Sequence, residues 1–190
     1  MIKENLLLAY VVIFFLYFVI RITTFYKKYK INPVVYVTAK FKDMLLWWSL
    51  TVIFLIYALI ITLFYLGIFG AVLTNSALDI IGFVVLALGF LIVALAHSQM
   101  GKSLRMGFDY KTKTKLVATG LFSYSRNPVY VGVIIQTFAI FLLVPNITTL
   151  TLLILLIINF YLIIKKEEKF LEKKFGKEYL NYKKKVGRFI

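Results

Sequence analysis

Apolar residues gather in long stretches along the chain, at 6–20, 45–66, 77–96 and 129–164. The only charged residue within them is Asp79. A transmembrane helix needs about 20 mostly apolar residues, so each of the first three stretches predicts one membrane span. The first is short, but Arg21 can reach back to the interface and residues 23–25 can lengthen the helix. No small-residue cleavage site follows it, which favours an uncleaved span over a signal peptide.

The fourth stretch is too long for a single span. A continuous helix over residues 129–164 would be about 54 Å long, whereas the hydrocarbon core of a bilayer is about 30 Å thick. Pro145 and Asn146 interrupt it near the middle. We therefore predict a helical hairpin, with two spans joined by a tight turn. In the third span, Gly82 and Gly89 predict close approach of a neighbouring helix.

The basic residues support a total of five spans. With five, the polar segments 21–43, 97–128 and 165–190 lie on one side and hold 22 of the 23 lysine and arginine residues. Positive residues gather on the cytoplasmic side of membrane proteins. The sequence thus predicts an all-α integral membrane protein with five transmembrane helices and a cytosolic C-terminal helix, ending in a short strand or coil. Its N-terminus is expected outside and its C-terminus inside.

Composition and charge exclude several classes of site. The chain is 62% hydrophobic with a formal net charge of +15. Because the basic residues lie between apolar spans, we expect them to contact anionic membrane lipid and expect no nucleic-acid partner. The chain has no cysteine and one histidine, His97, so no metal site is predicted. No glycine-rich phosphate loop or nucleophile elbow is present.

The C-terminal tail carries an acidic residue in an apolar stripe. At about 100° per residue, Glu168 falls on the same helical face as Ile164, Leu171 and Phe175. Five lysines of the tail fall on the opposite face: Lys166, Lys169, Lys173, Lys177 and Lys184. We expect Gly176 to interrupt the helix after this point. An ionisable residue at the membrane edge on an inward face is a candidate functional residue. The alternative is that Glu167 and Glu168 only pair with neighbouring lysines.

A second candidate lies where a polar segment meets the hairpin. Pro128 fits the first turn of a helix, and Asn127 fits the cap before it. Arg126 opposes the dipole of that helix unless an anion is nearby, so we expect a carboxylate or phosphate partner. The hairpin returns the chain to the same surface, where Arg126 and Glu168 can approach each other.

Two motifs resemble those of a known superfamily. Residues 119–132 read T-G-L-F-S-Y-S-R-N-P-V-Y-V-G, and residues 167–182 read E-E-K-F-L-E-K-K-F-G-K-E-Y-L-N-Y. Their order around an apolar hairpin is similar to that in the isoprenylcysteine carboxyl methyltransferase and phospholipid methyltransferase superfamily of integral membrane enzymes. The resemblance covers roughly residues 97–190, the predicted methyltransferase core, whereas residues 1–96 hold the first three spans and a basic cytosolic loop.

The resemblance implies an S-adenosylmethionine-dependent methyltransferase with its cofactor pocket at the cytosolic face. Arg126 and Glu167 are the predicted catalytic residues. The position-by-position match implies a larger set of cofactor-binding residues: Gly120, Leu121, Phe122, Arg126, Asn127, Pro128, Tyr130, Glu167 and Glu168. These residue types suit the cofactor, which carries an ammonium, a carboxylate and a sulfonium.

The methyl acceptor is expected to be a lipophilic small molecule or a prenylated molecule, because a pocket at the edge of a span can be reached from the bilayer. Methyl transfer to an ionised carboxylate needs no general base, which favours O-methylation, whereas an amine or hydroxyl would need Glu167 or a tyrosine as base. Isoprenylcysteine methyltransferases characteristically have histidine where this chain has Asn127. Asparagine resembles a broader prokaryotic branch, which predicts a prokaryotic plasma membrane and leaves the prenylcysteine substrate open.

Two other functions fit parts of the sequence. A membrane lipid reductase that uses NADPH could have a similar hairpin and polar tail, with Lys111, Lys113 and Lys115 contacting a 2′-phosphate. A non-catalytic membrane scaffold would need the basic loops only to bind anionic lipid. The sequence does not distinguish oligomeric states.

Overall fold

A computed structural model describes residues 2–35, 41–70, 75–107 and 114–189. These residues form six α-helices and two short 3₁₀ turns: α1 (Ile2–Tyr29), α2 (Phe41–Tyr65), α3 (Ser76–Met100), η2 (Gly101–Ser103), η3 (Gly120–Ser123), α4 (Pro128–Leu143), α5 (Ile147–Phe175) and α6 (Lys177–Lys185). Within these ranges the one β pairing is an isolated bridge between Val34 and Met106. The all-α prediction is confirmed.

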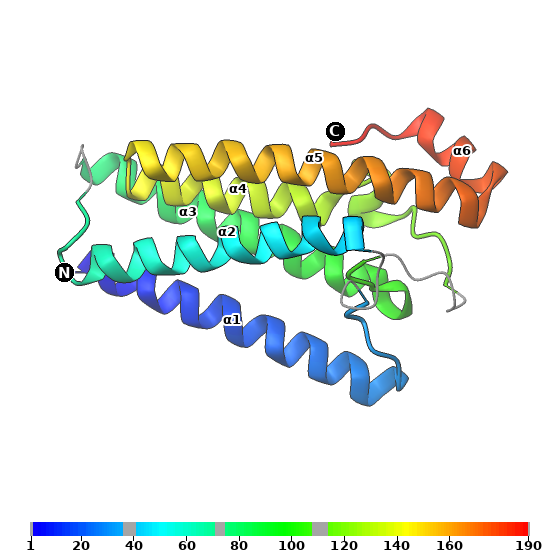
Figure 1. Ribbon diagram of the computed structural model, residues 1–190, viewed down its shortest axis with the longest axis horizontal. Coiled ribbons are helices and arrows are strands. Elements are labelled where there is room, and N and C mark those ends of the chain that lie inside the picture. Colours follow the sequence, from blue (N-terminus) through cyan, green and yellow to red (C-terminus); the bar gives the residue numbers. More distant parts are fainter. Residues whose placement is uncertain (1, 36–40, 71–74, 108–113, 190) are drawn as a thin grey trace.

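The helices α1 to α5 run along the long axis of the molecule, and α3 packs on α4 while α5 packs on α2 and α4 (Figure 1). The N-terminus and the α4–α5 turn lie at one end of this bundle. The end of α1, the start of α2, the end of α3 and the start of α4 lie toward the other end, where α6 also lies (Figure 1). The described parts of the three basic segments therefore share one end of the bundle, which we call the basic end.

Four of the five predicted spans are helices long and apolar enough to cross a membrane. The remaining helix, α4, has 16 residues and is about 24 Å long. It is short because it begins at Pro128 and ends two residues before Pro145. The crossing of α4 and the sidedness of the protein stay predictions.

The outer surfaces of these helices are apolar, as lipid contact requires. Phe15 on α1, Leu55 on α2 and Ile80 on α3 are each more than 60% exposed. Side chains between the helices are instead fully enclosed, among them Val93 and Leu156. A soluble domain would rarely expose so much contiguous apolar surface, so the bundle is that of an integral membrane protein.

Three glycines allow α3 and α4 to pack closely. A Cβ atom on Gly89 would lie 2.8 Å from the carbonyl oxygen of Gly132, and one on Gly132 would lie 2.9 Å from the carbonyl oxygen of Gly89. A Cβ atom on Gly82 would lie 2.7 Å from Cγ of Leu143. The close approach predicted at Gly82 and Gly89 is confirmed, and α4 is the helix that approaches.

The predicted hairpin and its turn are also confirmed. Asn146 caps α5 in a capping box with Thr149, which explains why the chain reverses there. One detail differs from the prediction, because the charged tail is not a separate helix and α5 continues without a break to Phe175. Gly176, with φ of +55°, ends it as expected and directs α6 along a new line. Residues 186–189, the described residues after α6, are coil and not a strand.

Candidate functional site

A cavity of about 460 Å³ lies at the basic end. Its walls come from the middle of α1, the first half of α2, the end of α3, the segments around η2 and η3, the start of α4, the second half of α5, and α6. The size is in the range of cavities that hold a small-molecule ligand or cofactor. The predicted residues that line it are Phe122, Arg126, Asn127, Pro128, Tyr130 and Glu167.

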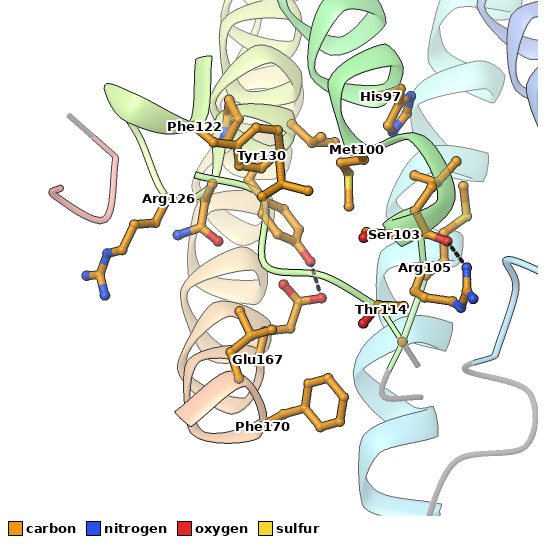
Figure 2. Close-up of a pocket in the computed structure, with 18 of the residues that line it drawn as sticks. His97, Met100, Ser103, Arg105, Thr114, Phe122, Arg126, Tyr130, Glu167 and Phe170 are labelled. Atoms are coloured by element: carbon orange, nitrogen blue, oxygen red, sulfur yellow. Dashed lines mark hydrogen bonds between the residues drawn. The ribbon is translucent and has the colours of Figure 1, made fainter. Parts of the chain in front are cut away.

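Glu167 and Tyr130 form one wall of this cavity. The Tyr130 hydroxyl donates a hydrogen bond of 2.9 Å to Oε1 of Glu167, and the two side chains face each other in Figure 2. The uncharged part of α5 ends at Ile164, so Glu167 lies beyond the membrane-spanning segment. Burial raises the pKa of Glu167 to about 7, although the hydrogen bond from Tyr130 acts in the opposite direction. This carboxyl group can therefore change its charge near neutral pH.

Glu168 has different surroundings, although it is the next residue. It is 5% exposed and lies 3.1 Å from Nη2 of Arg126. Arg188 donates two hydrogen bonds to it, from Nε to Oε1 at 2.9 Å and from Nη2 to Oε2 at 2.8 Å. We call Arg126, Glu168 and Arg188 the arginine cluster. The predicted approach of Arg126 and Glu168 is confirmed, as is the inward position of Glu168.

The cluster keeps Glu168 ionised. Burial would raise the pKa of Glu168, but the hydrogen bond from Arg188 and the charges of Arg126 and Arg188 lower it below its ordinary value. Glu168 is the anion that Arg126 was expected to need at the start of α4. The two glutamates therefore do not only pair with neighbouring lysines, because Glu167 contacts Tyr130 and Glu168 contacts two arginines.

Asn127 and Pro128 have the positions expected of them at the start of α4, with one difference. Pro128 occupies the first turn of α4, and Asn127 occupies its N-cap. However, the Asn127 side chain makes no capping hydrogen bond. Its Nδ2 donates instead to the carbonyl oxygen of Arg188 at 2.9 Å. Asn127 therefore connects α4 to the residues that follow α6.

The 3₁₀ turn η3 places Phe122 on the cavity, where its carbonyl oxygen accepts a hydrogen bond of 2.6 Å from the Tyr182 hydroxyl. Gly120 and Leu121 are not among the described residues that line the cavity. A Cβ atom on Gly120 would lie 2.6 Å from the side chain of Gln99, and the Leu121 amide donates to Oε1 of Gln99 at 2.8 Å. They pack η3 against the end of α3, and their role in cofactor binding stays a prediction.

Sequence reasoning missed Arg188. A signal was present, because Arg188 is the one arginine among ten basic residues of the tail, and the other nine are lysines. Arginine differs from lysine in its planar group, which can bind a carboxylate with two parallel hydrogen bonds. That geometry is the one that Arg188 adopts on Glu168.

Comparisons with known proteins agree with this arrangement. The family model "phospholipid methyltransferase" matches residues 78–178. The protein-S-isoprenylcysteine O-methyltransferase of Saccharomyces cerevisiae is 33% identical over 129 residues, which are 64% of this chain and 52% of the yeast protein. The chain thus spans about half the length of this curated relative.

A solved structure supports the fold. It is that of the eukaryotic intramembrane Ras methyltransferase ICMT, an isoprenylcysteine carboxyl methyltransferase, with a TM-score of 0.55 and 24% identity. The match covers 60% of this chain and 44% of that one.

The reductase hypothesis gains no support from these comparisons. Of its three lysines, Lys111 and Lys113 lie outside the described residues, and Lys115 lines the cavity. The family match covers more than half of the chain and includes Arg126, Tyr130 and both glutamates. The resemblance predicted from the two motifs is confirmed, and the chain belongs to the phospholipid methyltransferase family.

Proposed function

We propose that this protein is an integral membrane methyltransferase that uses S-adenosylmethionine and transfers its methyl group to a lipid-like or prenylated acceptor. The observation that carries the proposal is that Arg126 and Glu167 both line one cavity, in a chain of this family. We further propose that the basic end faces the cytosol, because it holds the positive segments. Asn127, which resembles the prokaryotic branch, supports a prokaryotic plasma membrane.

The cavity fits the groups of the cofactor. Glu167 supplies an anion for the ammonium. Arg126 supplies a cation for the carboxylate, and its Nη1 is buried without a well-formed hydrogen bond among the described residues. A buried donor without a partner is costly, so a ligand carboxylate there would be stabilised. Phe122 and Tyr130 supply aromatic surface for the sulfonium and the nucleoside.

The bound cofactor supplies a methyl group on a positively charged sulfur, and the protein contributes position and a water-poor site. A carboxylate acceptor needs no base, which favours O-methylation. Among the described residues at the cavity, Glu167 is suited to accept a proton from an amine or hydroxyl acceptor because its pKa is about 7. Burial raises the pKa of Tyr179 and of Tyr182 to about 12, so these tyrosines remain neutral near pH 7.

A second cavity supports an acceptor with an apolar tail. It has a volume of about 310 Å³ and lies between α1, α2 and α4. It shares five lining residues with the first cavity, Phe14, Phe18, Thr51, Phe54 and Val133. At its far side, the Tyr10 hydroxyl donates a hydrogen bond to Oε1 of Gln136. An apolar chain could lie in this space while its reactive end reaches Glu167.

Calorimetric titration of the purified protein with S-adenosylhomocysteine tests the cofactor. We expect saturable binding by the wild type and weaker binding by Arg126→Ala. A well-folded wild type that does not bind would contradict the proposal. Saturable competition by NADPH would instead favour the reductase.

The acceptor can be found with labelled methionine, by comparing lipid extracts of cells with and without the protein. Methyl label in a lipid fraction of only the expressing cells is the expected result. If Glu168→Gln and Arg126→Ala both leave cellular function intact at normal expression, the protein acts as a scaffold and the proposal is wrong.

A further inference from the structure

The residues after α6, at 186–189, turn back over the start of α4. We call them the C-terminal segment. The Gly187 carbonyl oxygen accepts hydrogen bonds from the Arg126 amide at 3.1 Å and from Nε of Arg126 at 3.2 Å. The Arg188 carbonyl oxygen accepts from Asn127 at 2.9 Å and from the Ser125 hydroxyl at 3.4 Å. The C-terminal segment thus contacts both the backbone and the side chain of Arg126.

Arg188 adds a side-chain contact from the same segment. Its two hydrogen bonds to Glu168 fix the carboxylate plane, and its guanidinium carbon lies 5.4 Å from the centre of the Tyr161 ring. Hydrogen bonds between two charged groups are about twice as strong as those between neutral groups. Glu168 in turn forms an ion pair with Arg126, with 3.1 Å between Oε1 and Nη2. A continuous chain of contacts therefore runs from Arg188 through Glu168 to Arg126.

Only one member of the arginine cluster lines the cavity. Arg126 lines it, whereas Glu168 and Arg188 do not occur among its described lining residues. Figure 2 shows the Arg126 side chain directed away from the pair formed by Tyr130 and Glu167. Glu168 and Arg188 therefore lie behind Arg126, where they can fix its orientation but do not meet a ligand directly.

We propose that Arg188 is a positioning residue that orients Arg126, through Glu168 and through Gly187, to bind the carboxylate at the amino-acid end of the cofactor. This inference rests on the proposed function. An arginine side chain loses considerable rotamer entropy when a ligand immobilises it. Holding Arg126 before the ligand arrives reduces that cost and leaves Nη1 available.

The inference predicts an effect confined to one end of the ligand. S-adenosylhomocysteine has the amino-acid end, whereas 5′-methylthioadenosine has the same nucleoside and thioether without it. We expect Arg188→Gln to raise the Kd for S-adenosylhomocysteine about tenfold and to leave the Kd for 5′-methylthioadenosine unchanged. Arg188→Lys keeps the charge but loses the paired hydrogen bonds, so its Kd should be intermediate.

Two controls separate this role from a general effect on folding or charge. Lys184→Ala removes one positive charge from an exposed side chain near the same segment and should change neither Kd. Because Arg188 acts largely through Glu168, the double variant Arg188→Gln with Glu168→Gln should bind no more weakly than the weaker single variant.

Several results would overturn the inference. One is an equal loss of affinity for both ligands in Arg188→Gln and Arg188→Lys, which indicates a role in folding alone. Another is an unchanged Kd for S-adenosylhomocysteine in both variants, and a third is full additivity in the double variant. A wild type that binds neither ligand would instead contradict the proposed function, so the two failures are distinguishable.

Discussion

The cavity wall around Glu167 and the arginine cluster around Glu168 begin at consecutive residues, yet they are opposite environments. Successive residues of a helix point about 100° apart, so Glu167 faces Tyr130 and the cavity while Glu168 faces Arg126 and Arg188. Burial raises the pKa of Glu167 to about 7. Burial acts in the same direction on Glu168, but the two arginines outweigh it and lower the pKa of Glu168. Identical side chains are thus suited to different roles by the charges beside them.

The largest expected difference between the two regions is in stability. Glu168→Gln leaves the buried guanidinium of Arg126 without its anion, which should lower the free energy of unfolding by about 3 kcal/mol. Glu167→Gln should lower it by less than about 1 kcal/mol, because Glu167 is already neutral in part near pH 7. Unfolding curves of both variants in detergent measure this. Equal losses would mean that the two environments do not differ as described.

The second difference is in ligand affinity. Glu167→Gln removes the anion proposed for the cofactor ammonium, so the Kd for S-adenosylhomocysteine at pH 8 should rise by about 10- to 100-fold. Stability should change little in the same variant, unlike in Glu168→Gln. Titration calorimetry gives the Kd, with Glu172→Gln as a control because Glu172 pairs with Lys183 outside the cavity. An unchanged Kd would remove Glu167 from the binding site.

A smaller change should come from the partner of Glu167. Tyr130→Phe removes the hydrogen bond that favours the ionised carboxylate, so the pKa of Glu167 should rise further. The Kd at pH 7 should then increase by a few-fold, and the loss should disappear at higher pH, where Glu167 ionises in both proteins. The Kd measured from pH 6 to pH 9 checks this. A loss of equal size at every pH would show that Tyr130 acts by contact with the ligand alone.

The smallest effect on cofactor affinity is expected far from both glutamates. Tyr10→Phe removes the hydrogen bond to Gln136 at the second cavity, so S-adenosylhomocysteine binding should be unchanged. The preference among acceptors that differ only in the length of an apolar chain should shift by a few-fold, because the floor of that cavity changes. Methyl transfer to such a series measures the shift. A change in cofactor affinity would show that the two cavities are not separate in function.

Much of the fold followed from the apolar pattern. The long helices, the hairpin turn and the helix end at Gly176 depend on local signals, namely uncharged length, Asn146 as a cap and a glycine. The pattern did not reveal the continuous passage of α5 into the tail. Charged residues can extend a helix as well as end one, so the change from apolar to charged at Ile164 did not mark a boundary.

The site was predictable only in part. Helical spacing placed Glu168 inward, and the hairpin brought Arg126 near it. The separate surroundings of Glu167 depend on Tyr130, which lies 37 positions away, and helical periodicity contains no information on such a pair. Arg188 was missed because the C-terminal segment has no regular structure, so no periodic pattern indicated where its side chain lies.

The most direct test of the central claim is titration of the wild type and of Glu167→Gln with S-adenosylhomocysteine at pH 6.5, in two buffers that differ in ionisation enthalpy. Below a pKa of about 7, Glu167 holds a proton in much of the protein, and the ligand ammonium favours the ionised form. The account predicts that the wild type binds with release of a proton and binds more weakly as the pH falls, whereas Glu167→Gln releases none. Absence of binding, or equal proton release by both proteins, would contradict it.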